Sequence, residues 1–159
     1  MLLAVSMMLS TAMPSRAEGF VEDPEVKIPL SAFGCEPFGG FCVEVGGKKV
    51  CYPGATLCHT VRGNGKTITY QDASVDDNFG GGTAGGNFCN WRIDWEYRDT
   101  NGKVYFTDAG PMHYKCEGSA YPIGRVDKKR RVVGKYGSVC AVFHASGGRR
   151  AAQCHFITQ

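Results

Sequence analysis

Five apolar or aromatic residues alternate strictly with five polar ones near the middle of this chain. The stretch reads Cys-Asn-Trp-Arg-Ile-Asp-Trp-Glu-Tyr-Arg over residues 89–98. Because successive side chains of a β-strand point to opposite faces, the alternation predicts a strand with one buried aromatic face and one charged face. Asn101-Gly102 follows and favours a type I′ hairpin turn, since both residues tolerate a positive φ. The residues that we expect to pack together in the core are Trp91, Ile93, Trp95, Tyr97 and Phe106.

Eight cysteines, an even number, indicate four disulfides in an exported chain. The best-defined pair lies in residues 41–52, where Gly46-Gly47 separates two short apolar strands. In that hairpin Cys42 faces Cys51 at a non-hydrogen-bonded position, where side chains approach closely enough for a cross-strand disulfide. The same register, continued outward, places Cys35 opposite Cys58. The predicted pairs are Cys35–Cys58, Cys42–Cys51, Cys89–Cys116 and Cys140–Cys154.

Turn signals set the expected registers of the remaining strands. Asn64-Gly65 would place Val61 opposite Ile68, and the turn at residues 101–102 would place Met112 opposite Trp91. A three-residue loop in the stretch 145–148 would bring the last two cysteines together.

The distribution of these signals predicts the fold class. No segment of the chain shows the 3.6-residue period of an amphipathic helix, and turn residues recur at the spacing typical of all-β domains. We expect residues 35–159 to form a single cysteine-rich domain of about eight strands built from consecutive hairpins. Its architecture would be a disulfide-stapled antiparallel β-sandwich or a partly closed barrel.

Residues 1–17 resemble a signal peptide. A short apolar run is followed by Ser15 and Ala17, which are small residues at the −3 and −1 positions of a cleavage site before Glu18. The run is too short to span a membrane, and no later stretch is apolar for long enough to do so. The expected location of the mature protein is therefore extracellular, where disulfides persist.

Residues 18–34 form an acidic segment without any cysteine until Cys35. Val26, Ile28 and Leu30 alternate with Lys27 and a proline, which is the pattern of an edge strand. We expect an extended arm whose apolar residues pair with a protein partner or with an edge of the same domain.

Basic residues gather toward the other end of the chain. Between residues 125 and 159 there are eight basic residues and one acid. If the last hairpin folds beside the basic turn, these side chains would form one patch for an anionic surface or polymer, although a solubilising turn is an equal alternative. The expected patch consists of Lys128, Lys129, Arg130, Arg131, Arg149 and Arg150.

Histidines are the first candidates for acid–base catalysis. His144 and His155 fall on neighbouring strands near two arginines, and His113 is a third candidate. The expected register separates the first two along the ladder, so they need not converge. Asp94 and Glu96 share one face of a strand, as paired carboxylates of a glycosidase can, but flanking arginines favour a solvated charged face.

Two functional classes remain open. We expect a small secreted binding protein without catalytic activity, such as a toxin, a toxin component, an antimicrobial protein or an extracellular recognition module. The alternative is a small secreted hydrolase, a nuclease above all, acting through the basic C-terminal region. The sequence indicates no cofactor. It also lacks the Cys-x-x-Cys and His-x₃₋₅-His spacings of zinc sites, so we expect no metal centre.

Overall fold

The computed structural model describes residues 30–52, 54–77, 88–117 and 123–158. These ranges contain β-strands and irregular segments, with no helix among them that is long and apolar enough to cross a membrane. The predicted signal peptide and residues 18–29 of the predicted arm lie outside the described residues. The part of the chain that is described is all-β, as the sequence predicts.

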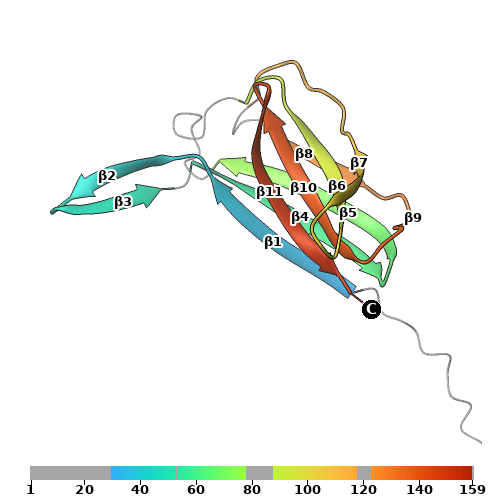
Figure 1. The fold of residues 1–159 in the computed structure, drawn as a ribbon. Helices are drawn as coiled ribbons and strands as arrows, with labels where there is room; N and C mark the ends of the chain where they lie inside the picture. Colours follow the sequence, from blue (N-terminus) through green and yellow to red (C-terminus); the bar gives the residue numbers. More distant parts are fainter. Residues whose placement is uncertain (1–29, 53, 78–87, 118–122, 159) are drawn as a thin grey trace, which may run out of the picture.

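Strands in the described ranges form three antiparallel sheets (Figure 1). The first sheet has the order β1-β4-β5-β8, with β9 also paired to β5. Its strands are β1 (Leu30–Phe38), β4 (Ala55–Asn64), β5 (Thr67–Asp77), β8 (Ile123–Asp127) and β9 (Arg131–Val132). The second sheet has the order β11-β10-β6-β7. Its strands are β6 (Arg92–Asp99), β7 (Val104–Asp108), β10 (Gly137–Ala145) and β11 (Gly148–Ile157).

These two sheets face each other as a sandwich. No hydrogen-bonded pairing joins them among the described strands, so they do not close into a barrel. The third sheet is a hairpin of β2 (Phe41–Val45) and β3 (Lys48–Tyr52), which projects away from the sandwich in Figure 1. We call this hairpin, residues 41–52, the finger.

A single register runs through the finger and into the first sheet. In the finger Cys42 pairs with Cys51, as predicted, around a turn at Gly46 and Gly47 that both have positive φ. Beyond the break at residues 39–40, β1 and β4 resume the same register and place Cys35 opposite Cys58. The segment from residue 30 to residue 63 is therefore one interrupted hairpin.

All four predicted disulfides are present. The bonds are Cys35–Cys58, Cys42–Cys51, Cys89–Cys116 and Cys140–Cys154. Three join residues that face each other across a strand pair, and Cys89–Cys116 lies directly beside the isolated bridge between Phe88 and Glu117. Four disulfides are consistent with an oxidising compartment.

The core lies between the two larger sheets and is centred on β6. Trp91, Ile93, Trp95 and Tyr97 are all at most 2% exposed, which confirms the predicted faces of this strand. Phe106 is the exception, because it is 46% exposed; its ring centroid lies 5.5 Å from that of Tyr97 and 5.7 Å from the guanidinium of Arg131.

The predicted register of β4 and β5 is wrong. The turn is at Gly65 and Lys66 rather than at Asn64-Gly65, and a bulge lies between Arg62 and Gly63. Both irregularities shift the pairing, so Gly63 rather than Val61 faces Ile68. A bulge adds one unpaired residue to one strand, which periodicity in a single sequence does not reveal.

Two other local registers also differ from expectation. His113, not Met112, forms the bridge with Trp91, because the chain after β7 gains one residue before the bridge. Ser146 and Gly147, both with positive φ, form a two-residue turn between β10 and β11 in place of the expected three-residue loop. A bulge next to His144 restores the register that pairs the last two cysteines.

Candidate functional site

Asp94 is the one buried carboxylate among the described residues. It stands on the charged face of β6, is 3% exposed, and accepts a hydrogen bond from the Gly110 backbone N–H to Oδ1 at 2.9 Å. Its other oxygen, Oδ2, accepts a hydrogen bond from Arg92 Nε at 3.0 Å and lies 3.3 Å from His144 Nε2. A buried carboxylate needs such partners to offset its lost hydration. Asp94 therefore fixes two partly exposed side chains beside each other.

Strand pairing brings three arginines to His144. His144 of β10 faces Arg92 of β6 on one side and Arg149 of β11 on the other. Arg150 is the extra residue of the β11 bulge. It lies between Arg149, which pairs with His144, and residue 151, which pairs with Phe143. Bulges often re-aim side chains next to functional sites. We call Arg92, Asp94, His144, Arg149 and Arg150 the arginine–histidine cluster.

The charge of the cluster is positive. Three guanidinium groups face one carboxylate, before any charge on the imidazole is counted. Arg92 donates to Asp94 through Nε, the one nitrogen of this guanidinium with a described hydrogen bond. Arg150 donates through Nε to the Ala145 carbonyl at 3.1 Å. Arg149 is exposed. Guanidinium groups bind phosphate, sulfate and carboxylate with paired N–H donors, so the cluster has the chemistry of an oxyanion site.

The structure divides the predicted basic patch. Arg131 forms ion pairs with Asp108 and Asp127, with N···O distances of 2.7 and 3.4 Å. Asp108 belongs to β7 and Arg149 to β11, which are the two edges of the four-stranded sheet. Lys128, Lys129 and Arg130 are exposed beside Arg131, whereas Arg149 and Arg150 join the cluster.

The other histidines do not join His144. His155 lies against His59, with its Nε2 2.9 Å from the His59 carbonyl oxygen. His113 stacks on Trp91 at 3.8 Å between ring centroids. His59 itself is fully buried, and burial together with the nearby His155 lowers its pKa from 6.5 to about 3. Each of these three rings packs against another aromatic or imidazole ring.

Glu96 is not part of an open carboxylate pair with Asp94. Its Oε2 accepts a hydrogen bond from Arg98 Nη2 at 2.6 Å, and Asp94 is occupied by Arg92 and His144. The charged face of β6 is thus a row of ion pairs, and the expectation of a solvated face is wrong because Asp94 is buried there. What the sequence did not reveal is that β10 supplies an imidazole to Asp94.

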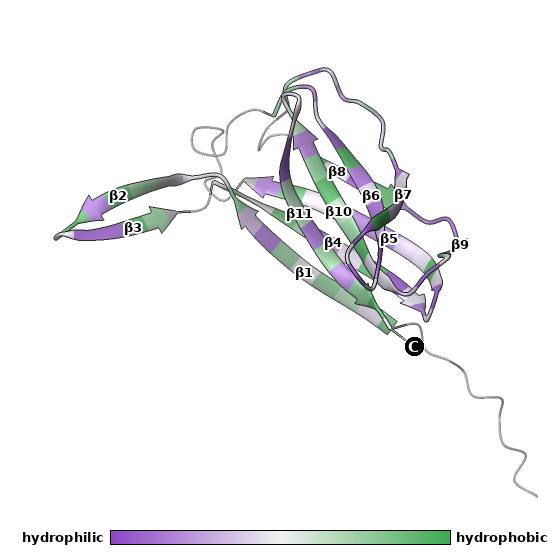
Figure 2. Cartoon of the chain, in the orientation of Figure 1, coloured by the Kyte–Doolittle hydropathy of each residue, from purple (hydrophilic) through white to green (hydrophobic). Residues whose placement is uncertain are grey.

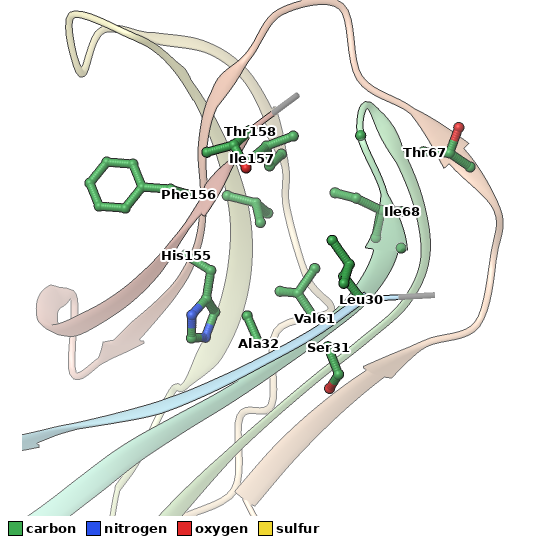
Figure 3. Close-up of a pocket in the computed structure, with 13 residues that line it drawn as sticks. Leu30, Ser31, Ala32, Val61, Thr67, Ile68, His155, Phe156, Ile157 and Thr158 are labelled. Carbon is green, nitrogen blue, oxygen red and sulfur yellow. The ribbon is translucent and has the colours of Figure 1, made fainter. Parts of the chain in front are cut away.

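A separate apolar cavity of about 320 Å³ opens where β1 begins and β11 ends (Figure 3). Leu30, Val61, Ile68 and Ile157 line it, and His155 is the one titratable side chain in its wall. An apolar pocket of this kind can hold a small hydrophobic group, but it lacks the converging polar groups that fix a substrate.

The finger exposes apolar side chains outside the sandwich. Its two strands pair only with each other among the described strands, and both carry hydrophobic positions beside hydrophilic ones (Figure 2). Val43, Val45 and Val50 are 38%, 61% and 37% exposed.

No family model, curated protein or solved structure matches this chain. Among the described residues there is also no group of three or more His, Cys, Asp or Glu side chains that could hold a metal ion. The function must therefore be inferred from the geometry of the chain itself.

Proposed function

We propose that this chain is a secreted binding protein without catalytic activity, a toxin component or extracellular recognition module that contacts an anionic target through the arginine–histidine cluster. The observation that carries the proposal is the placement of Asp94. It holds Arg92 and His144 side by side next to the two arginines of the β11 bulge. Secretion is supported by the predicted signal peptide and by the four disulfides.

The fixed positions of Arg92 and His144 favour binding over a merely solubilising role. A solubilising arginine gains nothing from a fixed position, whereas a binding site loses less side-chain entropy when its groups are already held. Arg92 and His144 are held by a buried carboxylate on a central strand of the sheet, next to a disulfide-stapled pair of strands. Lys128, Lys129 and Arg130 make no comparable side-chain contacts in the described hydrogen-bond and ion-pair network.

The test is retention on phosphocellulose, a matrix that carries phosphate esters. The oxidised chain of residues 18–159 should bind, and the triple variant R92Q/R149Q/R150Q should elute at clearly lower salt. The matched control K128Q/K129Q/R130Q removes the same charge from the other part of the basic sequence and should elute close to the unmodified protein. Equal earlier elution of both variants would show that only net charge matters and would refute the cluster as a site.

A hydrolase is the second candidate, and the His144–Asp94 contact favours it. A carboxylate that orients an imidazole is a recurring arrangement in acid–base catalysis, and nearby arginines could hold a phosphate. Incubation with RNA decides between the candidates. Cleavage that is lost in H144N but retained in H113N would establish a nuclease, whereas binding to RNA without cleavage would support the non-catalytic proposal.

A further inference from the structure

The finger carries an apolar face that its own fold does not use. Val43 faces Val50 across the ladder, and Val45 continues the same face toward the tip. The disulfide between residues 42 and 51 lies on the opposite face, because adjacent residues of a strand alternate. In the sandwich, by contrast, apolar faces are turned inward to the core. The three valines therefore remain exposed without a described partner sheet.

The finger keeps its shape by means other than burial. A two-stranded hairpin is marginal alone, and here a tight glycine turn and the Cys42–Cys51 disulfide hold it. Burial of the valines is thus available for a contact with another surface. The charges point to the kind of surface: Lys48 and Lys49 follow the turn directly, against one acid, Glu44, within residues 41–52.

The finger and the arginine–histidine cluster occur at the same end of the sandwich. Phe38, the last residue of β1 before the finger, packs against Phe143, with ring centroids 5.8 Å apart. Phe143 directly precedes His144 in β10. Because Phe143 points into the core, His144 and its arginines lie on the outer face of the four-stranded sheet, near the end from which the finger projects.

We propose that this end of the molecule docks on a bilayer surface rich in anionic phospholipids. The valines of the finger enter the boundary between headgroups and acyl chains, while Lys48, Lys49 and the arginines of the cluster meet lipid phosphates. The inference rests on the proposed function of the cluster and names its target. A bilayer fits better than a protein groove because an apolar tip flanked by lysines needs no complementary shape, only an apolar layer beneath negative charge.

Neither burial of the valines nor attraction of the basic residues is strong alone. Binding should therefore depend on the lipid composition of the bilayer. A few valines bury little area, and single weak anchors give marginal membrane binding. Each basic residue near an anionic surface adds only a modest attraction. Binding should therefore need both anionic lipid and the apolar tip, and it should weaken as salt is raised.

The experiment is flotation of the oxidised chain of residues 18–159 with vesicles of phosphatidylcholine alone or mixed with phosphatidylglycerol. We expect flotation with the mixed vesicles only. Val45→Asp should weaken it by about tenfold or more. Val132→Asp is the matched control, because Val132 is 69% exposed on the body of the protein, and it should float as the unmodified chain does.

Each alternative outcome overturns the membrane inference in a recognisable way. Retention on phosphocellulose without flotation would support an anionic target for the cluster and refute a bilayer as that target. Undiminished flotation of Val45→Asp would show that the finger does not insert into the bilayer. A concentration-dependent dimer that Val45→Asp abolishes in sedimentation, without vesicle binding, would assign the apolar face to a second copy of the chain.

Discussion

The imidazole of His59 lies nearly parallel to the indole of Trp95 in the centre of the sandwich. Their ring centroids are 5.3 Å apart and the planes differ by 20°. His59 Nδ1 is 3.2 Å from the Gln153 carbonyl oxygen, which suits an N–H donor, and Nε2 has no hydrogen-bond partner in the described structure. The site thus accommodates the neutral ring and penalises a second proton.

This environment predicts acid-sensitive stability. The folded-state pKa of His59 is about 3, below the ordinary 6.5, so the unfolded chain binds its proton at higher pH than the folded chain. The stabilising contribution is full above pH 6.5 and falls as pH drops toward 3, by about 1.4 kcal/mol for each pH unit. Urea unfolding at several pH values measures it. His59→Phe should flatten the dependence in this window, and an unchanged slope would contradict the assignment.

Replacement of Trp95 should be far more costly than replacement of Arg92 on the neighbouring face. Trp95 is fully buried, and large-to-small changes of aromatic core residues cost about 3–5 kcal/mol. That is a large share of the roughly 5–15 kcal/mol available to a domain. Arg92 is partly exposed, and when it is removed Asp94 keeps the Gly110 N–H and the His144 imidazole as partners, so the loss should be smaller. Secreted yield and thermal unfolding of Trp95→Ala and Arg92→Ala would compare them, and similar losses would mean that the faces of β6 are misassigned.

Much of this fold could be predicted because its signals are local. The alternation over residues 89–98 and the turn at Gly46-Gly47 were sufficient to place the tryptophans inside and to pair Cys42 with Cys51. The β4–β5 register could not be predicted, since the bulge near Gly63 has no signature in a hydrophobic pattern. The partial exposure of Phe106 was equally hidden.

The candidate site was visible only in pieces. His144 and the arginines of β11 were recognised as near neighbours because a hairpin joins them. Asp94 was read as part of a separate charged face, since its contact with His144 depends on the pairing of β6 with β10, strands that a long intervening segment separates. Side-chain pairing between such distant strands is set by the whole sandwich and not by any local turn.

Asp94→Asn should weaken phosphate binding clearly while changing the stability of the domain little. The amide can still accept from the Gly110 N–H, but it loses the charge that holds Arg92 and His144 together. We expect elution from phosphocellulose at lower salt although the variant gains one positive charge overall. Glu96→Gln is the matched control on the same strand, with the same change of charge and an ion pair to Arg98. If both variants bind more tightly than the parent, net charge alone governs binding and the positioning role of Asp94 is refuted.

The disulfides of the finger and of the last hairpin should differ in their effect on the whole domain. Cys42–Cys51 closes a short loop in a sheet of its own, whereas Cys140 is fully buried and its bond to Cys154 joins two strands of the sandwich. Native disulfides typically contribute about 2–4 kcal/mol. The double variant C42S/C51S should keep the main thermal transition but become sensitive to limited proteolysis between residues 41 and 52. C140S/C154S should lower the transition itself, and the reverse pattern would contradict the independence of the finger.

The start of β1 predicts where the N-terminal arm ceases to be dispensable. Val26 and Ile28 of the predicted partner arm precede the described residues, but Leu30 already pairs with Gly63 as the first residue of β1, and the rest of the predicted arm up to residue 34 continues that strand. Gly34 is also held closely, because a Cβ there would lie 2.6 Å from Gln153 Nε2 of β11. A chain that begins at residue 30 keeps every ladder that the structure describes, so its melting temperature should stay within a few degrees of that of residues 18–159. A chain that begins at residue 35 loses half of β1 and one wall of the apolar cavity, and its transition should drop sharply. If removal of residues 18–29 alone produces that drop, the arm is an integral part of the sheet and cannot serve as a free element for a protein partner.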